Sequence, residues 1–271
     1  MKETNASFFY LKIFFLAVAV IIVFSVLYRL GSVIINSSFK NNAFSILYIS
    51  KESKIISVDK KLGTVSYLSI GNVRDLVKGR SPFAASVVLG VPINGIMYDT
   101  DHNLNPDFKE FTSLKNELRL LFSFGTVFKN MNEYDVYKVM SIARMARKDN
   151  KRVLKVNLRN EKSVKENITD NFKDSSILDS RLTVEIVNGT NINGLANSVA
   201  AVLTHLGYNV VFLHTVKGFY NDSSYVSFEI DKNSYVSSLI DFTAFSEKKK
   251  TLSSSADVTI YLGSDLESKF N

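Results

Sequence analysis

The segment at residues 188–194, Asn-Gly-Thr-Asn-Ile-Asn-Gly, joins a predicted strand, 181–189, to a predicted helix, 193–207. A helix N-terminus presents unpaired backbone N–H groups, and amide side chains donate and accept hydrogen bonds. The loop could therefore hold a sugar hydroxyl, an acetamido group or a phosphate, with Asn188, Gly189, Thr190, Asn191, Asn193 and Gly194 as candidate binding residues. We favour a structural role, because a turn at Gly189 and a helix cap at Asn193 explain most of these residues.

The other residue types that do chemistry show no catalytic or metal-binding spacing. His102, His205 and His214 lack the spacing of metal ligands, and the absence of cysteine excludes thiolate zinc sites and cysteine nucleophiles. Asp99, Asp101 and Asp107 surround a turn where a cation could bind, but a solvated turn with a helix cap explains them better. No Gly-x-Ser-x-Gly, Walker or dinucleotide-binding motif occurs. We expect neither a metal nor a cofactor.

A predicted transmembrane helix at residues 8–28 is the clearest element of the chain. These 21 residues carry one charge, Lys12, and would span about 30 Å as a helix, the thickness of a hydrocarbon core. Tyr10 and Tyr28 lie near the ends, where amphipathic rings favour the membrane interface. The sequence therefore predicts a single-pass membrane protein.

Two other interpretations of this segment are less favoured. A soluble core helix would need apolar partners on every side. A cleaved signal peptide would be followed by a small-x-small site, whereas the residues after Arg29 continue apolar. Charge does not fix the orientation, because Lys2 and Lys12 on one side balance Arg29 and Lys40 on the other.

The net charge of +7 is modest for a chain of 271 residues and includes no basic block typical of nucleic-acid binding. The basic stretch 143–152 is consistent with the C-terminus of a helix, which cations complement. We therefore expect no nucleic-acid partner. A weakly basic surface is compatible with lipid headgroups or an anionic envelope polymer.

Two α/β regions follow the anchor. In the first, apolar runs predict strands at 44–50, 54–59, 64–70, 93–99 and 152–158, and helices at 82–89, 108–122 and 133–148. In the second, the order strand, helix, strand, strand, helix, strand predicts a β-α-β-β-α-β domain with both helices on one face of a small sheet. The intervening residues are polar through most of their length. The predicted organisation is a cytoplasmic tail 1–7, a transmembrane helix 8–28, a stalk 29–43, an α/β domain 44–158, a linker 159–180 and a C-terminal domain 181–265.

The C-terminal region resembles the LytR C-terminal domain. The matching features are the strand end VEIVNGT, the helix opening NGLANSVAAVL, the LGYNVV that follows and the closing ADVTIYLGSD, within residues 182–265. Residues 44–158 resemble, more faintly, a shortened LytR-CpsA-Psr domain, through FSILYIS, KIISVDKKLGTVSYLSI and VVLGVPINGIMYD. Enzymes of that family transfer undecaprenyl-pyrophosphate-linked glycopolymers to the cell wall, using a metal-binding carboxylate and arginines on the pyrophosphate.

This resemblance implies two weak catalytic candidates, Arg74 and Asp75, which stand near the family's Arg-Asp pair. The family's acidic loop after the first strand is replaced by SKESK, and its arginine-rich stretch is not reproduced near 115–150. Pyrophosphate transfer needs several converging charges. We therefore expect a non-catalytic, membrane-anchored protein of the cell envelope, facing the periplasm or wall and binding peptidoglycan, an anionic glycopolymer or envelope proteins. The alternatives are a divergent glycopolymer transferase and a membrane-tethered transcriptional regulator; the lack of a basic recognition helix disfavours the latter.

Overall fold

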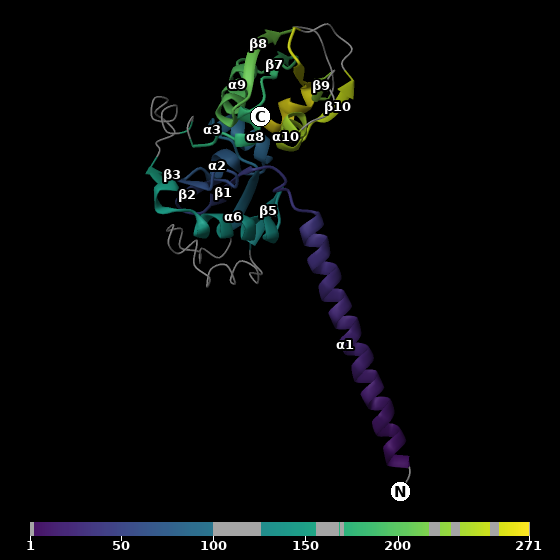
Figure 1. The fold of residues 1–271 in the computed structure, drawn as a ribbon. Helices are drawn as coiled ribbons and strands as arrows, with labels where there is room; N and C mark the ends of the chain where they lie inside the picture. Colours follow the sequence, from purple (N-terminus) through teal and green to yellow (C-terminus); the bar gives the residue numbers. More distant parts are fainter. Residues whose placement is uncertain are drawn as a thin grey trace. The chain divides into compact units, whose positions relative to one another are not determined.

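A computed structural model describes residues 3–99, 126–155, 168, 171–216, 223–228, 234–249 and 255–270. The chain forms two compact units, Met1–Ser37 and Ser38–Asn271. The first is α1 (Glu3–Ile35), a helix of 33 residues drawn in purple in Figure 1. The predicted strand at 152–158 and helix at 108–122 lie partly or wholly outside the described residues.

Among the described residues, α1 is the one helix long and apolar enough to cross a membrane. The apolar part, Phe8–Ile35, has 28 residues, which corresponds to about 42 Å of helix against roughly 30 Å of hydrocarbon. The helix passes Tyr28, where we expected the span to end, and continues through Gly31 to Ile35, because no proline interrupts it. Part of the expected stalk is therefore helical.

The first sheet of the second unit is mixed, with strand order β5-β4-β1-β2-β3-β6. The first three strands form an antiparallel meander, β4 runs parallel to β1, and β6 runs parallel to β3. The strands are β1 (Ala43–Ile49), β2 (Ser53–Asp59), β3 (Thr64–Gly71), β4 (Gly95–Asp99), β5 (Thr126–Lys129) and β6 (Lys151–Lys155). Between them lie α2 (Arg74–Val77), α3 (Pro82–Leu89), α6 (Glu133–Met145) and the 3₁₀ turn η1 (Lys148–Asn150).

Both faces of the central strands β1, β2 and β3 are buried. Ile46 of β1 packs in one core with Val139 of α6, and the adjacent Leu47 packs in a second core with Leu89 of α3. Successive residues of β1 thus enter different cores, which explains why the strand is apolar without alternation.

The second sheet has five strands in the order β10-β9-β11-β7-β8. Its elements are β7 (Thr183–Asn188), α9 (Leu195–Leu206), β8 (Asn209–Thr215), β9 (Tyr225–Phe228), α10 (Ser234–Thr243), β10 (Ser246–Lys249) and β11 (Val258–Leu262), followed by η2 (Ser264–Leu266) and α11 (Glu267–Phe270). The alternation of strands and helices confirms the predicted fold class. Residues of α9 and α10 share one core with Val184 and Ile186, so both helices cover the same face. The predicted order of four strands and two helices lacked one strand, because β10, between α10 and β11, pairs parallel to β9.

Helix α3 packs against both sheets. Ala85 and Leu89 pack against the first sheet, whereas Phe83 and Val87 join the core of the second. A helix buried on opposite sides needs apolar residues all round, and PFAASVVL supplies them. The predicted linker also contributes to both cores, with Ile168 and Phe172 in one and Ile177, in α8 (Ser175–Leu178), in the other. The boundary at 159–180 stays a prediction, but these parts of it are packed.

Candidate functional site

The loop at 188–194 is held together by its own polar groups. The Asn188 side chain, 2% exposed, accepts hydrogen bonds from the backbone N and Oγ1 of Thr190 at 3.0 and 2.7 Å. Its Nδ2 donates to the carbonyl of Ile192 at 3.0 Å, and Thr190 Oγ1 accepts from the backbone N of Ile192 at 3.1 Å. Most of the groups that we considered for ligand binding are therefore used to shape the loop.

Asn191 is exposed, and its donors are paired with a carboxylate. Its backbone N and its Nδ2 donate to Oε1 of Glu267 in α11, at 2.8 and 3.1 Å. An anion at this point would face the charge of Glu267. The geometry therefore disfavours phosphate binding here and favours a structural role.

Two details of the predicted structural role were wrong. The N-cap of α9 is Gly194, with φ of 77° and no side-chain cap, so Asn193 does not cap the helix. Gly189 is absent from the glycines with positive φ, and its backbone N instead bonds the carbonyl of Leu262 at 3.0 Å. The turn that needs glycine is thus at Gly194, because a side chain at that φ would strain the backbone.

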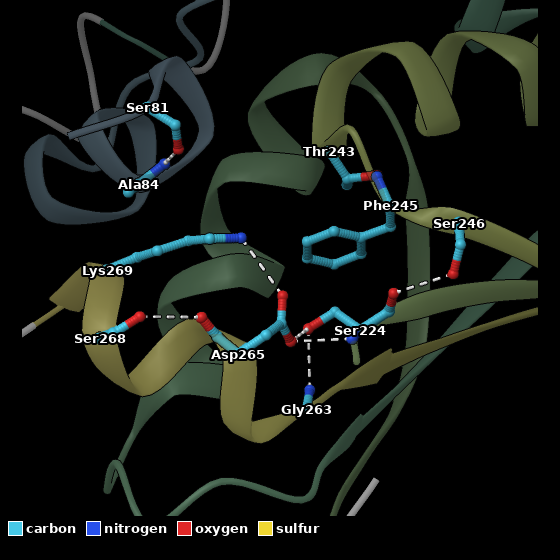
Figure 2. Close-up of polar contacts among 10 residues, drawn as sticks. All are labelled: Ser81, Ala84, Ser224, Thr243, Phe245, Ser246, Gly263, Asp265, Ser268 and Lys269. Atoms are coloured by element: carbon cyan, nitrogen blue, oxygen red, sulfur yellow. Dashed lines mark hydrogen bonds and ion pairs between the residues drawn. The ribbon is translucent and has the colours of Figure 1, made fainter. Parts of the chain in front are cut away.

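The closing motif of the domain holds a second loop (Figure 2). The Asp265 carboxylate accepts from the backbone N and Oγ of Ser224, at 2.8 and 2.6 Å, and from Lys269 Nζ at 3.2 Å. Ser224 Oγ accepts in turn from the backbone N of Gly263 at 2.9 Å. Two carboxylates that follow β11 therefore each hold a loop: Asp265 binds Ser224, and Glu267 binds Asn191. The sequence motif did not reveal this role.

The weak catalytic candidates are not brought into a charged site. Arg74 and Asp75 are both exposed in the four-residue helix α2. In the described part of the chain, no group of three or more His, Asp or Glu side chains could hold a metal ion. Asp101, Asp107 and His102 lie outside the described residues. The described geometry supplies no convergent set of charges for pyrophosphate chemistry.

The two described histidines have different surroundings. His205 Nδ1 lies 3.1 Å from the carbonyl of Gly90, which joins α9 to the end of α3. His214 Nε2 lies 3.0 Å from Glu185 Oε1, and its ring stacks on Phe212 with centroids 6.2 Å apart. His214 therefore belongs to a cluster that we did not predict.

This cluster lies on the face of the second sheet that points away from α9 and α10. Ile186 enters the core, so the adjacent Glu185, paired with Phe212 of β8, points to the opposite face. Glu185 Oε2 also accepts from Thr259 Oγ1 at 3.3 Å. Phe212 is 42% exposed, whereas the Glu185 side chain is only 13% exposed. We call Phe212, His214 and Glu185 the β8 cluster. The cluster offers an exposed aromatic ring next to a carboxylate.

A second aromatic pair lies on the same face. Tyr225 and Tyr261 stack with centroids 4.5 Å apart, and Lys248 Nζ lies 4.0 Å from the Tyr225 ring centroid. Burial, with the nearby Tyr225 and Glu185, raises the pKa of Tyr261, so its phenol stays a neutral hydrogen-bonding group at physiological pH. In the strands YVSF and VTIYL, residues that enter the core alternate with residues that face away from it. This alternation could have placed Tyr225 and Tyr261 on one face from the sequence alone.

Residues 181–266 match the family model described as LytR cell envelope-related transcriptional attenuator. These residues form a LytR C-terminal domain. The match confirms the recognition made from the two ends of the region, and the structure shows that those ends are adjacent strands, since β7 pairs with β11. In this LytR C-terminal domain, the Gly189–Leu262 hydrogen bond joins the NGTNING loop to the closing LGSD segment, and Glu267 joins the loop to α11.

Other comparisons are remote. A Listeria monocytogenes protein described as a candidate transcriptional factor is 11% identical, with a TM-score of 0.28, over 44% of this chain and 81% of that one. A Listeria innocua protein, Lin1025, is 14% identical, with a TM-score of 0.20, over 72% of this chain and 88% of that one. No curated protein matches the chain.

Proposed function

We propose that this protein is a non-catalytic, extracytoplasmic envelope protein that is anchored by α1 and binds cell-wall glycan through its LytR C-terminal domain. The family match connects the domain with the cell envelope, and α1 is compatible with a membrane anchor. The β8 cluster is the observation that carries the proposal. It combines an exposed aromatic surface with a hydrogen-bond acceptor.

The chemistry of the cluster suits a sugar ring. A pyranose has an apolar face of C–H groups and a rim of hydroxyl and acetamido donors. The exposed Phe212 ring offers an apolar surface, and Glu185 accepts hydrogen bonds. A carboxylate repels a phosphate-bearing polymer, so the neutral sugars of peptidoglycan fit better than an anionic glycopolymer.

The transferase alternative has less support. Arg74 and Asp75 are exposed on α2, and Arg80, the next arginine, donates to the carbonyls of Leu76 and Lys269 at 2.9 and 2.6 Å. Turnover of a lipid-pyrophosphate donor with magnesium or manganese, abolished by Arg74→Ala or Asp75→Ala, would restore the transferase.

A sedimentation assay tests the proposal. The full chain in neutral detergent is mixed with purified peptidoglycan, and the bound fraction is measured. We expect saturable binding that Phe212→Ala weakens about tenfold. Val127→Ala on the first sheet is the matched control, because Val127 is also an exposed apolar strand residue, 52% exposed, and its loss leaves binding unchanged. Absence of binding, or equal losses in both variants, would refute the assignment; binding to envelope proteins alone would replace glycan by a protein partner.

A further inference from the structure

A cavity of about 380 Å³ lies between α6 and the segment that follows α1. Lys40, Lys60 and Lys138 contribute three cations to its wall, and Tyr134 and Tyr137 contribute two aromatic rings. Among the described residues, those that line the cavity include no Asp or Glu. A wall of this composition favours an anionic group with an adjoining apolar part.

Two acids close to the cavity in the sequence are used inside the fold. Asp135 of α6 is fully buried, and its carboxylate accepts hydrogen bonds from the backbone N of Ser38, Phe39 and Asn132 at 3.1, 3.0 and 2.9 Å. Asp59 is also buried, and it accepts from the backbone N of Leu62 at 2.9 Å. Both carboxylates are used inside the fold, and neither lines the cavity.

The walls of the cavity are ordered by side-chain contacts. Tyr134 and Tyr137 stack with centroids 6.2 Å apart and planes at 15°. Lys138 Nζ lies 4.7 Å from the Tyr134 ring centroid and donates to the carbonyl of Phe39 at 3.0 Å. The Lys60 backbone N donates to the carbonyl of Asn42 at 2.8 Å. The cavity is therefore formed before a ligand binds.

Only a few residues of chain separate the last residue of α1 from the cavity wall. Phe39 follows Ile35, the last residue of α1, by four positions, so the two Cα atoms are at most about 14 Å apart. Phe39 is buried, stacks on Phe44 with centroids 5.0 Å apart, and is held by Asp135. If α1 spans a bilayer, the cavity lies within reach of the headgroups of one leaflet.

We propose that this cavity binds the phosphate of an anionic phospholipid of that leaflet. The lysines contact the phosphate, and the two tyrosines lie at the interface between headgroup and acyl chains, where amphipathic rings are favoured. The inference rests on α1 lying in a membrane, but not on glycan binding by the LytR C-terminal domain. Bound lipid would fix the soluble unit close to the membrane surface.

Native mass spectrometry of the full chain in neutral detergent tests this inference. Short-chain phosphatidylglycerol is titrated, with phosphatidylcholine of the same chain length as the neutral comparison. We expect one phosphatidylglycerol to bind at saturation and phosphatidylcholine to bind far more weakly. Lys40→Gln with Lys60→Gln should weaken phosphatidylglycerol binding about 30-fold, since each lysine near an anionic lipid contributes roughly a factor of five.

Lys51→Gln with Lys78→Gln is the matched control, because it removes the same charge from two exposed lysines outside the cavity. This control should retain wild-type affinity. Equal losses in both double variants, or equal binding of the two lipids, would overturn the inference. Competition with millimolar inorganic phosphate distinguishes a lipid phosphate from free phosphate as the ligand. If lipid binding is unchanged, the site binds lipid. If the lipid is fully displaced, the site binds free phosphate instead. The Gln variants replace exposed side chains, and an unchanged melting temperature verifies their fold.

Discussion

The ring of Phe83 in α3 packs edge-on against the ring of Phe245, which precedes β10, with centroids 5.0 Å apart and planes at 70°. The ring of Phe242 in α10 also packs against the Phe83 ring, with centroids 5.9 Å apart. Arg80, which precedes α3, donates to the carbonyl of Lys269 at 2.6 Å. The region that contains the first sheet and the LytR C-terminal domain therefore share part of one core.

Truncation of this contact should destabilise both sheets together. Phe83 is 4% exposed, so Phe83→Ala leaves a cavity, and we expect a loss of about 3 kcal/mol in the free energy of unfolding. Val88→Ala in the same helix, 38% exposed, should change it by less than about 0.5 kcal/mol. Denaturant unfolding of the full chain in detergent, with probes on each sheet, measures both values. Two separate transitions in the wild type would contradict a shared core.

The loop at 188–194 offers a test of its structural role. Asn188→Ala removes three hydrogen bonds from a buried site, and we expect a loss of about 2 kcal/mol in stability. Asn193→Ala should be close to neutral, because Asn193 is exposed and does not cap α9. Thermal unfolding compares the two variants. If Asn193→Ala greatly weakened peptidoglycan binding while stability stayed unchanged, the loop would be a binding site rather than a purely structural element.

Asp135 should be a strong determinant of stability. Asp135→Ala leaves the backbone N–H groups of Ser38, Phe39 and Asn132 without their acceptor, and we expect a loss of about 3 kcal/mol. Glu133→Ala in the same helical turn is the control, with an expected change below about 0.5 kcal/mol. Hydrogen exchange at residues 38–40 reports the local effect. Unchanged protection there in Asp135→Ala would show that another group holds this segment.

Two buried tyrosines predict a loss of stability at alkaline pH. Burial raises the pKa of Tyr208 and Tyr235, whose hydroxyls donate to the carbonyls of Tyr235 and Leu182 at 3.2 and 3.0 Å. The folded state keeps both phenols neutral, so their contribution is complete below the ordinary pKa of 10.0 and is lost as pH rises above it.

The slope of melting temperature against pH measures this contribution. Tyr235→Phe should lose about 1 kcal/mol at neutral pH, from the missing hydrogen bond, yet show a flatter decline above pH 10. Tyr137→Phe, at an exposed ring, should keep the wild-type slope. Identical slopes in all three proteins would mean that other groups cause the alkaline loss.

The envelope-related family of the C-terminal domain predicts the location of the C-terminus. A reporter active only outside the cytoplasm, fused after Asn271, should be active in cells, because the family of the C-terminal domain is related to the cell envelope. A cytoplasmic reporter at the same position should be silent. The reverse pattern would place the soluble unit in the cytoplasm and remove the basis for wall binding.

The sequence by itself determined the elements whose signal is local. Helix α1 follows from a long apolar run, and α3, α6, α9 and the β1–β3 meander follow from apolar periodicity and turn residues. The alternation of strands and helices in 183–262, together with the motifs at its two ends, was enough to recognise the LytR C-terminal domain.

Only the tertiary structure decided what depends on distant partners. The polar strand β10 exists because β9 offers backbone hydrogen bonds, which require no apolar pattern. Phe172 is buried because the first sheet lies beside it, and Asn191 is occupied because Glu267, far along the chain, reaches its amide. The β8 cluster likewise forms when β7 and β8 pair. A local pattern records the period of a segment, whereas the burial and hydrogen bonding of each side chain are fixed by residues that the pattern does not contain.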